Sequence, residues 1–267
     1  MPITTRQELD LFVQTLLKGE VRVLRFQLLT KDANVRLPQR KNHPAGETPL
    51  MLASGRGHLP AVRLLISRGA EVNETNRFRQ PPLLYAVRGN HISTVNFLLG
   101  HGAQPNLLMA NGDSILGEAA TGSIDLRICR ALIKNGADPC LANKMGSTAL
   151  HVAAFQGRKD VAELLVRAGA DVNHRDRHGL GPLSCAISRK HEDLVLLLLK
   201  NGADPRIQAE SLGVAAWHGH AGFVKLLIAQ GWDVHSKAYQ KLTPLAHARN
   251  RKHKSVIRIL TVAGAIR

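Results

Sequence analysis

The chain has few aromatic residues, few cysteines and no long apolar run. None of its apolar stretches reaches the length of a membrane-spanning helix, and the N-terminal sequence MPITTRQELDLF lacks the apolar centre of a signal peptide. The three cysteines, Cys129, Cys140 and Cys185, are odd in number and form no CxxC motif, so we expect small buried thiols rather than a disulfide framework. These features predict an intracellular protein, cytoplasmic, nuclear or both, without membrane insertion.

Signatures of catalysis are also missing. The sequence has no phosphate-binding glycine-rich loop, no GxSxG elbow and no HExxH motif, so we predict neither an enzyme nor a cofactor. Thirteen histidines suggest a metal site, and His218 and His220 form an HxH pair. No cysteine or carboxylate cluster completes a ligand set at a recognised spacing, and we predict no metal.

Acidic residues are scarce. Lys and Arg number 36 against 20 Asp and Glu, which gives a formal net charge of +16. Such an excess favours anionic partners: acidic protein segments, nucleic acid or an anionic membrane surface. An aromatic content of 4% gives little support to a base-stacking platform, and no amphipathic anchor or lipidation motif supports a membrane adaptor.

A glycine, usually followed by alanine, returns after an apolar helical stretch at intervals of 33, 34, 33, 33, 29 and 33 residues. A second landmark keeps the same phase: a tripeptide such as Thr48-Pro49-Leu50 or Thr148-Ala149-Leu150 precedes each glycine by about 20 residues and leads into an alanine. Self-similarity at this period predicts a solenoid of stacked units. The glycines are Gly69, Gly102, Gly136, Gly169, Gly202, Gly231 and Gly264.

Each unit has the apolar spacing of two short helices. Leu150 to Ala154 mark a first helix, Val161 to Val166 mark a second, and Gly169 stands where a left-handed residue ends the helix. Proline in the tripeptide suits a first helical turn, and the preceding Thr or Ser can cap it. The unit is therefore predicted as turn, helix, loop, helix.

This unit resembles the ankyrin repeat, whose period is 33 residues and whose signature is Thr-Pro-Leu-His-x-Ala. The match is best over Thr148–Ala153 and the following Gly169-Ala170-Asp171-Val172-Asn173, and the resemblance covers about residues 4–267. It implies an all-α solenoid of about eight helix-loop-helix units with short hairpin fingers, forming a single domain over 1–267. The expected units are 4–36, 37–73, 74–106, 107–140, 141–173, 174–206, 207–235 and 236–267, of which the first and last are caps.

Several departures from the period are expected to be local. One extra residue falls near Thr121–Asp125 in a loop between helices, and the unit from 207 lacks four residues of its finger before Ser211. Trp232 replaces the usual alanine and is expected to pack on the last repeat. Five histidines occupy one equivalent place, five residues after the marker alanine, which indicates a loop framework rather than a metal site. They are His58, His91, His191, His220 and His253.

In the ankyrin family the fingers and first helices line a concave face, and this implies where a partner binds. On this face we expect a basic stripe with two aromatic residues, since Arg and Trp are enriched in interface hot spots. The first-helix positions are Arg56, Arg88, Phe155, Arg158, Arg189, Lys190, Trp217, His218, Arg249 and Arg251, with Val87, Gln156 and Lys252 beside them. The finger positions are Arg77, Arg79, Lys144, Arg175, Arg177, Lys237 and Lys241.

The preferred hypothesis is a monomeric, non-catalytic scaffold or adaptor whose basic concave face binds an acidic protein segment. The alternative is phosphate-directed nucleic-acid binding through the same face, which depends strongly on salt. The charges can also be a solvated face, and the chain a fragmentary or engineered module. The basic segment Arg249–Lys254 resembles a nuclear-import tract but falls within the last unit. The family further implies possible asparagine hydroxylation at Asn73 and Asn173.

Overall fold

The fold is helical throughout the described part of the chain. The computed structural model describes residues 6–28, 32–37, 46–204, 207, 209–237 and 239–265. Those residues contain sixteen helices and, in place of strands, two isolated bridges at Leu37–Glu47 and Leu108–Ser114. The prediction of an all-α solenoid is confirmed. The residues group into two compact units: unit 1 is Met1–Ala119 with Ser123–Asp138, and unit 2 is Ala120–Gly122 with Pro139–Arg267. A single domain over 1–267 stays a prediction.

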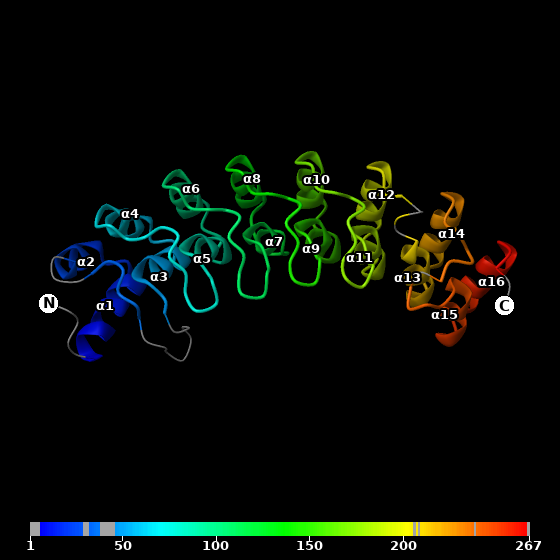
Figure 1. The fold of residues 1–267 in the computed structure, drawn as a ribbon, viewed down its shortest axis with the longest axis horizontal. Helices are drawn as coiled ribbons and strands as arrows, with labels where there is room; N and C mark the ends of the chain where they lie inside the picture. The colour runs from blue at the N-terminus through cyan, green and yellow to red at the C-terminus, as the bar shows by residue number, and fades with distance from the viewer. Residues whose placement is uncertain are drawn as a thin grey trace. The chain divides into compact units, whose positions relative to one another are not determined.

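Unit 1 is built from four helix pairs in two layers (Figure 1). The first helices α1, α3, α5 and α7 pack on one another in sequence order, and so do the second helices α2, α4, α6 and α8. Each first helix also packs on the second helix of its own pair, and this contact forms part of the hydrophobic core. The bounds are α1 Arg6–Lys18, α2 Val21–Gln27, α3 Pro49–Gly55, α4 Leu59–Ser67, α5 Pro82–Arg88, α6 Ile92–Gly100, α7 Ile115–Ala119 and α8 Leu126–Lys134.

Unit 2 repeats the same arrangement with four more pairs (Figure 1). The first helices α9, α11, α13 and α15 pack in order, α10 packs on α12, and α14 packs on α16. The bounds are α9 Ala149–Gln156, α10 Lys159–Arg167, α11 Pro182–Ser188, α12 Glu192–Lys200, α13 Glu210–His218, α14 Ala221–Ala229, α15 Pro244–Asn250 and α16 Lys254–Val262.

The sequence landmarks begin and end these helices as predicted. Pro49, Pro82, Pro182 and Pro244 are the first residues of their helices, where the missing N–H costs little. The Thr48 hydroxyl accepts a hydrogen bond from the Met51 N–H at 3.4 Å. All seven marker glycines have φ between +83° and +91°, so the second helices from α4 onward are each followed by a left-handed glycine.

The repeated histidines hold neighbouring repeats together. All five are the N-cap residues of second helices, and four of them bond through Nε2 to a carbonyl of the preceding repeat. Each of those four rings lies against a left-handed glycine, where an added Cβ would come within about 3 Å of the ring. The prediction of a loop framework is confirmed. The bonds are His58 to Leu17 (2.9 Å), His91 to Gly55 (3.1 Å), His191 to Phe155 (3.1 Å) and His253 to Trp217 (3.0 Å).

Asparagine at the end of four of the repeats makes a second link between neighbouring repeats. The Asn73 amide donates to the Gly102 carbonyl at 2.8 Å, and its oxygen accepts from the Gln104 N–H at 2.8 Å. Both partners of Asn73 therefore lie in the next repeat and not in its own turn. The same pair of bonds joins Asn34 to Gly69 and Glu71, Asn106 to Gly136 and Asp138, and Asn173 to Gly202 and Asp204.

The departures from the period have local effects. The helix α7 has only five residues, and the loop over residues 120–125 absorbs the extra residue as predicted. The shortened segment before Ser211 includes Pro205, Arg206 and Gln208, which lie outside the described residues. Trp232 is buried, at 3% exposure, so it belongs to the core of unit 2.

Cys140 occupies the linking position in unit 2 and makes a weaker link, its thiol donating to the Gly169 carbonyl at 3.4 Å. We predict that Cys140→Asn stabilises unit 2 by about 1 kcal/mol, because an amide supplies both bonds of the other repeats. Urea denaturation followed by circular dichroism measures this. Cys140→Ala, which removes the thiol without adding an amide, is the control. Equal midpoints for the Asn and Ala variants would contradict the linking role.

Candidate protein-interaction face

Most residues of the predicted stripe are exposed side chains of the first helices, their ends or the fingers. Val87 is the exception, because it is fully buried in the core-facing side of α5 and cannot contact a partner. Trp217 is half-buried and Phe155 is 42% exposed. The other exposed members are Arg56, Arg77, Arg79, Arg88, Lys144, Gln156, Arg175, Arg177, Arg189, Lys190, His218, Lys237, Lys241, Arg249, Arg251 and Lys252.

Three arginines of the stripe are already paired with carboxylates. Arg88 bonds to Glu118 at 3.0 and 3.2 Å, and Arg175 lies 3.6 Å from Glu210. Arg158 takes the N-cap place that histidine fills in other repeats. Its side chain is only 14% exposed and bonds to Asp160 and to the Thr121 carbonyl. These pairs hold the framework, and their charge is partly neutralised.

Two arginines of unit 2 instead lie over aromatic rings. The Arg189 guanidinium carbon is 4.0 Å from the centre of the Phe155 ring, and that of Arg251 is 4.3 Å from the Trp217 ring. Within the described part of the chain neither arginine forms an ion pair with a carboxylate. Stacking fixes the guanidinium plane and leaves its N–H edge for a planar anion.

The ring of Trp217 belongs to a larger aromatic group. The Tyr239 and His247 rings meet it edge-on, with centroids 6.5 and 5.5 Å away. His247 is fully buried and its Nε2 lies 2.9 Å from the Tyr239 carbonyl, so this group ties the last finger to α13 and α15. The ring face beneath Arg251 is therefore firmly supported.

Several basic residues of the stripe adopt a left-handed backbone where other repeats have glycine. Lys190 and Lys252 both have φ +60°, at the place held by Gly57, Gly157 and Gly219. In the fingers Arg79 and Lys241 both have φ +58°. A side chain at such an angle costs about 1 kcal/mol or more relative to glycine.

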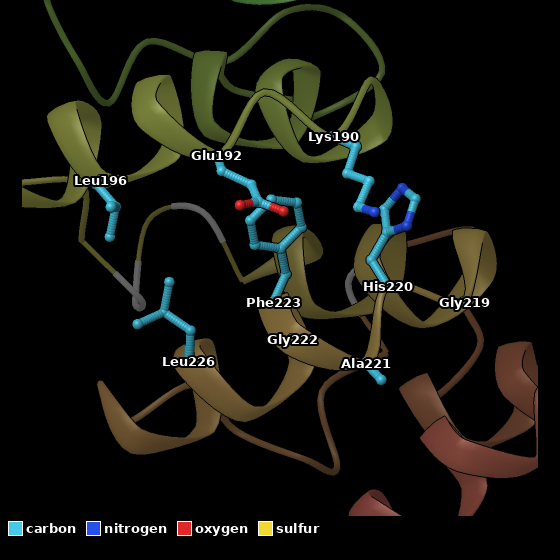
Figure 2. A pocket seen from close by; sticks show the side chains of 9 residues that line it. All are labelled: Lys190, Glu192, Leu196, Gly219, His220, Ala221, Gly222, Phe223 and Leu226. Carbon is cyan, nitrogen blue, oxygen red and sulfur yellow. The ribbon is translucent and has the colours of Figure 1, made fainter.

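Lys190 stands where other repeats have a glycine packed against the next histidine ring. The next histidine here is His220, whose buried Nε2 makes no hydrogen bond of ordinary geometry. Burial lowers the pKa of His220, although the nearby Ser188 carbonyl opposes this. The side chains of Lys190 and His220 face each other at a groove of about 480 Å³ between α12 and α14 (Figure 2). The groove is also lined by Glu192, Leu196, Gly219, Ala221, Gly222, Phe223 and Leu226.

His218 is exposed on the face, and its ring stacks on that of His220 with centroids 5.6 Å apart. Burial lowers the pKa of His218, and the positive charges of His220, Arg251 and Arg189 lower it further. Among the described residues, no three His, Cys, Asp or Glu side chains come together as metal ligands.

Sequence reasoning missed a buried carboxylate beneath this face. Glu210 begins α13, is 1% exposed, and accepts hydrogen bonds from the Gly181 N–H at 3.2 Å and the Ser184 hydroxyl at 3.3 Å. Burial raises its pKa, although Arg175 opposes the shift. Glu210 stands where other repeats have Thr, Ser, Pro or Gly, and this departure from the repeat signature is visible in the sequence.

Two exposed finger side chains were also missed. Phe78 is 42% exposed and Met145 is 48% exposed, each two residues after the asparagine that closes its finger. Two backbone bonds close the finger of Met145, from the Asn143 N–H to the Ser147 carbonyl at 2.9 Å and from the Gly146 N–H to the Asn143 carbonyl at 2.8 Å. Apolar tips beside the basic finger residues add contact area for a partner.

Comparison with known proteins identifies the repeat. The profile of a family described as ankyrin repeats (three copies) matches residues 12–109 and 116–209, well over half of the chain. The chain belongs to the ankyrin repeat family. The predicted resemblance is thereby confirmed, and ankyrin repeats generally mediate protein–protein interaction.

Relatives share the repeat within much longer proteins. Human transient receptor potential cation channel subfamily A member 1 is 30% identical over 161 residues, 60% of this chain and 14% of the relative. The mouse B-cell lymphoma 3 protein homolog is 38% identical over 109 residues, which are 40% of this chain and 24% of the relative. The ankyrin repeat and KH domain-containing protein mask-1 of Caenorhabditis elegans is 32% identical over 117 residues, which are 44% of this chain and 4% of the relative. The chain thus spans at most about a quarter of these relatives.

Among the described residues no helix is both long and apolar enough to cross a bilayer.

The hydroxylation of Asn73 and Asn173 stays a prediction. The side-chain amides of these two residues are the ones that bond to the next repeat.

The left-handed Lys190 gives a first prediction for this face. Lys190→Gly should raise the free energy of unfolding by about 1 kcal/mol, because glycine adopts the left-handed backbone without strain. The same change at Lys225, within the helix α14, should lower it by about 1 kcal/mol. Urea denaturation compares the two. A destabilised Lys190→Gly protein contradicts the assignment of strain.

Glu210 gives a second prediction, on pH. Because its pKa is raised in the fold, its contribution to stability is complete below the unfolded pKa of about 4.3 and is lost as the pH rises through the folded value. Glu210→Gln should therefore raise the denaturation midpoint at pH 7 and lose this advantage near pH 4. Denaturation at both pH values measures the effect, and a gain that grows toward low pH would contradict it.

Proposed function

We propose that this ankyrin array is a non-catalytic adaptor that binds an acidic protein segment through the first-helix and finger face of unit 2. The two arginines stacked on Phe155 and Trp217 carry the proposal. Each offers a fixed guanidinium edge and, within the described residues, lacks a carboxylate partner. The family supports protein binding in general, and the acidic nature of the partner is our inference from charge.

The positive charge of the surrounding surface also supports the binding of an acidic segment. The chain carries a net charge of +16, and Arg177, Lys190, Arg249 and Lys252 are exposed near the ends of the same first helices and fingers. Such a surface speeds the encounter with an acidic segment, while stacked arginines and a supported tryptophan slow its release. Arg88 of unit 1, already paired with Glu118, contributes less to this attraction.

The proposal includes a monomer in the cytoplasm or nucleus. The three cysteines form no disulfide, and Cys129 is buried whereas Cys140 is exposed; thiols without disulfides suit a reducing compartment. Burial and the neighbouring carboxylates Asp176 and Glu210 raise the pKa of Cys185 to about 12, so that thiol is unreactive at neutral pH.

Binding of a labelled glutamate-rich peptide of about a dozen residues, followed by fluorescence anisotropy, tests the proposal. We expect Arg189→Ala and Trp217→Ala each to weaken binding about tenfold, a loss of about 1.4 kcal/mol. Raising the salt from about 50 to about 300 mM should weaken it further. Lys225→Ala, which removes an equal charge from the second-helix layer, is the control and should change little.

Two outcomes contradict the proposal. If single-stranded DNA of equal charge displaces the peptide and binds more tightly than it, the alternative of nucleic-acid binding is favoured instead. Equal losses in Arg189→Ala and Lys225→Ala indicate general charge attraction without a defined face. Affinity capture with and without nuclease gives the matching readout, because a protein partner survives nuclease treatment.

A further inference from the structure

The stacked arginines of unit 2 belong to a three-residue arrangement that occurs twice. We call Phe155, Arg189 and Lys190 module A; the corresponding residues two repeats later form module B. In each module an aromatic residue near the end of one first helix lies under an arginine at the end of the next, and a lysine follows that arginine. Module B consists of Trp217, Arg251 and Lys252.

The lysines are a further feature that the two modules share. Lys190 and Lys252 both have φ +60°, and each directly follows its stacked arginine. Glycine fills the same place in the intervening repeat at Gly219, with φ +73°, without strain. Residues held in an unfavourable backbone conformation cluster at functional sites. A positive side chain is thus present twice where the backbone favours none.

The chemistry of one module suits a carboxylate. A stacked guanidinium presents parallel N–H donors along its edge, which match the two oxygens of a carboxylate, and the adjacent ammonium adds a second charge. Arg189, Lys190, Arg251 and Lys252 are all exposed, so an incoming side chain can reach them.

His218 of α13 lies near the arginines of both modules. Both Arg189 and Arg251 act electrostatically on that imidazole. The helices α9, α11, α13 and α15 pack in order, and packed helices lie about 8–10 Å apart, so equivalent places two repeats apart are separated by about 16–20 Å. An extended peptide covers that distance in about 5–6 residues at about 3.3 Å each.

We propose that modules A and B together form a bivalent site for one extended segment that carries two acidic groups about 5–6 residues apart. This inference rests on the proposed function and adds the spacing that the partner must have. Joining two weak carboxylate contacts through one chain makes the second contact intramolecular, which raises the overall affinity without any new contact.

Synthetic peptides with two Asp-Glu pairs joined by Gly-Ser spacers test the spacing on the full chain. The spacers have no residue, about five residues or about ten, and a fourth peptide has a single pair. We expect the five-residue spacer to bind at least about tenfold more tightly than the single pair, and the peptide without a spacer to gain about twofold or less. Fluorescence anisotropy at low salt measures all four.

Variants distinguish bivalent binding from total charge. Arg189→Ala or Arg251→Ala alone should abolish the gain of the five-residue spacer while weakening the single pair about twofold or less. Lys225→Ala should preserve the gain. Lys190→Gly, which is expected to be more stable than the parent, should reduce the gain, so the test does not depend on variants that fold poorly.

The outcomes separate this inference from the proposed function. If all acidic peptides bind in proportion to charge and spacing has no effect, the bivalent site is wrong and the acidic-segment proposal stands. If no acidic peptide binds above the level of a neutral Gly-Ser peptide, both are wrong.

Discussion

The contact between neighbouring repeats is the constraint on which the structure depends. A single pair of short helices has too little apolar surface to be stable alone, so each repeat needs its neighbours. The asparagine at the end of one repeat bonds to the glycine carbonyl and a following N–H of the next, as Asn73 does with Gly102 and Gln104. The bonded carbonyl belongs to the left-handed glycine that follows the second helix, so the same marker residue ends a helix and joins two repeats.

Much of the fold could be predicted because it repeats. Helix pairs, the left-handed glycines and the histidine framework each appear several times, so a chance match at one place is outweighed by the others. Contacts that occur once could not be predicted in the same way. Glu210 replaces a capping residue and is buried by Gly181 and Ser184, partners that only the stacked helices bring together.

The location of the basic stripe on the first helices and fingers could be predicted, but the ion pairs of its arginines could not. Family geometry placed the stripe on the first helices and fingers, but it did not show that Arg88 and Arg158 are neutralised by Glu118 and Asp160. It also included Val87, which is buried because it faces the core side of α5. Side-chain direction and charge partners depend on the neighbouring repeat, which a single repeat signature does not contain.

Some positions of the repeat serve both the candidate binding face and the contacts between repeats. Lys190 stands at such a position, and this explains its backbone strain. The left-handed place between two helices normally holds glycine, since the next repeat's histidine packs against it. Lysine there costs backbone energy, so stability favours glycine. The repeats are already held together by a dozen hydrogen bonds, four from histidines and eight from asparagines, so the array can tolerate that loss at one junction. The periodic fold therefore has room for binding residues at places where a single small domain would lose its stability.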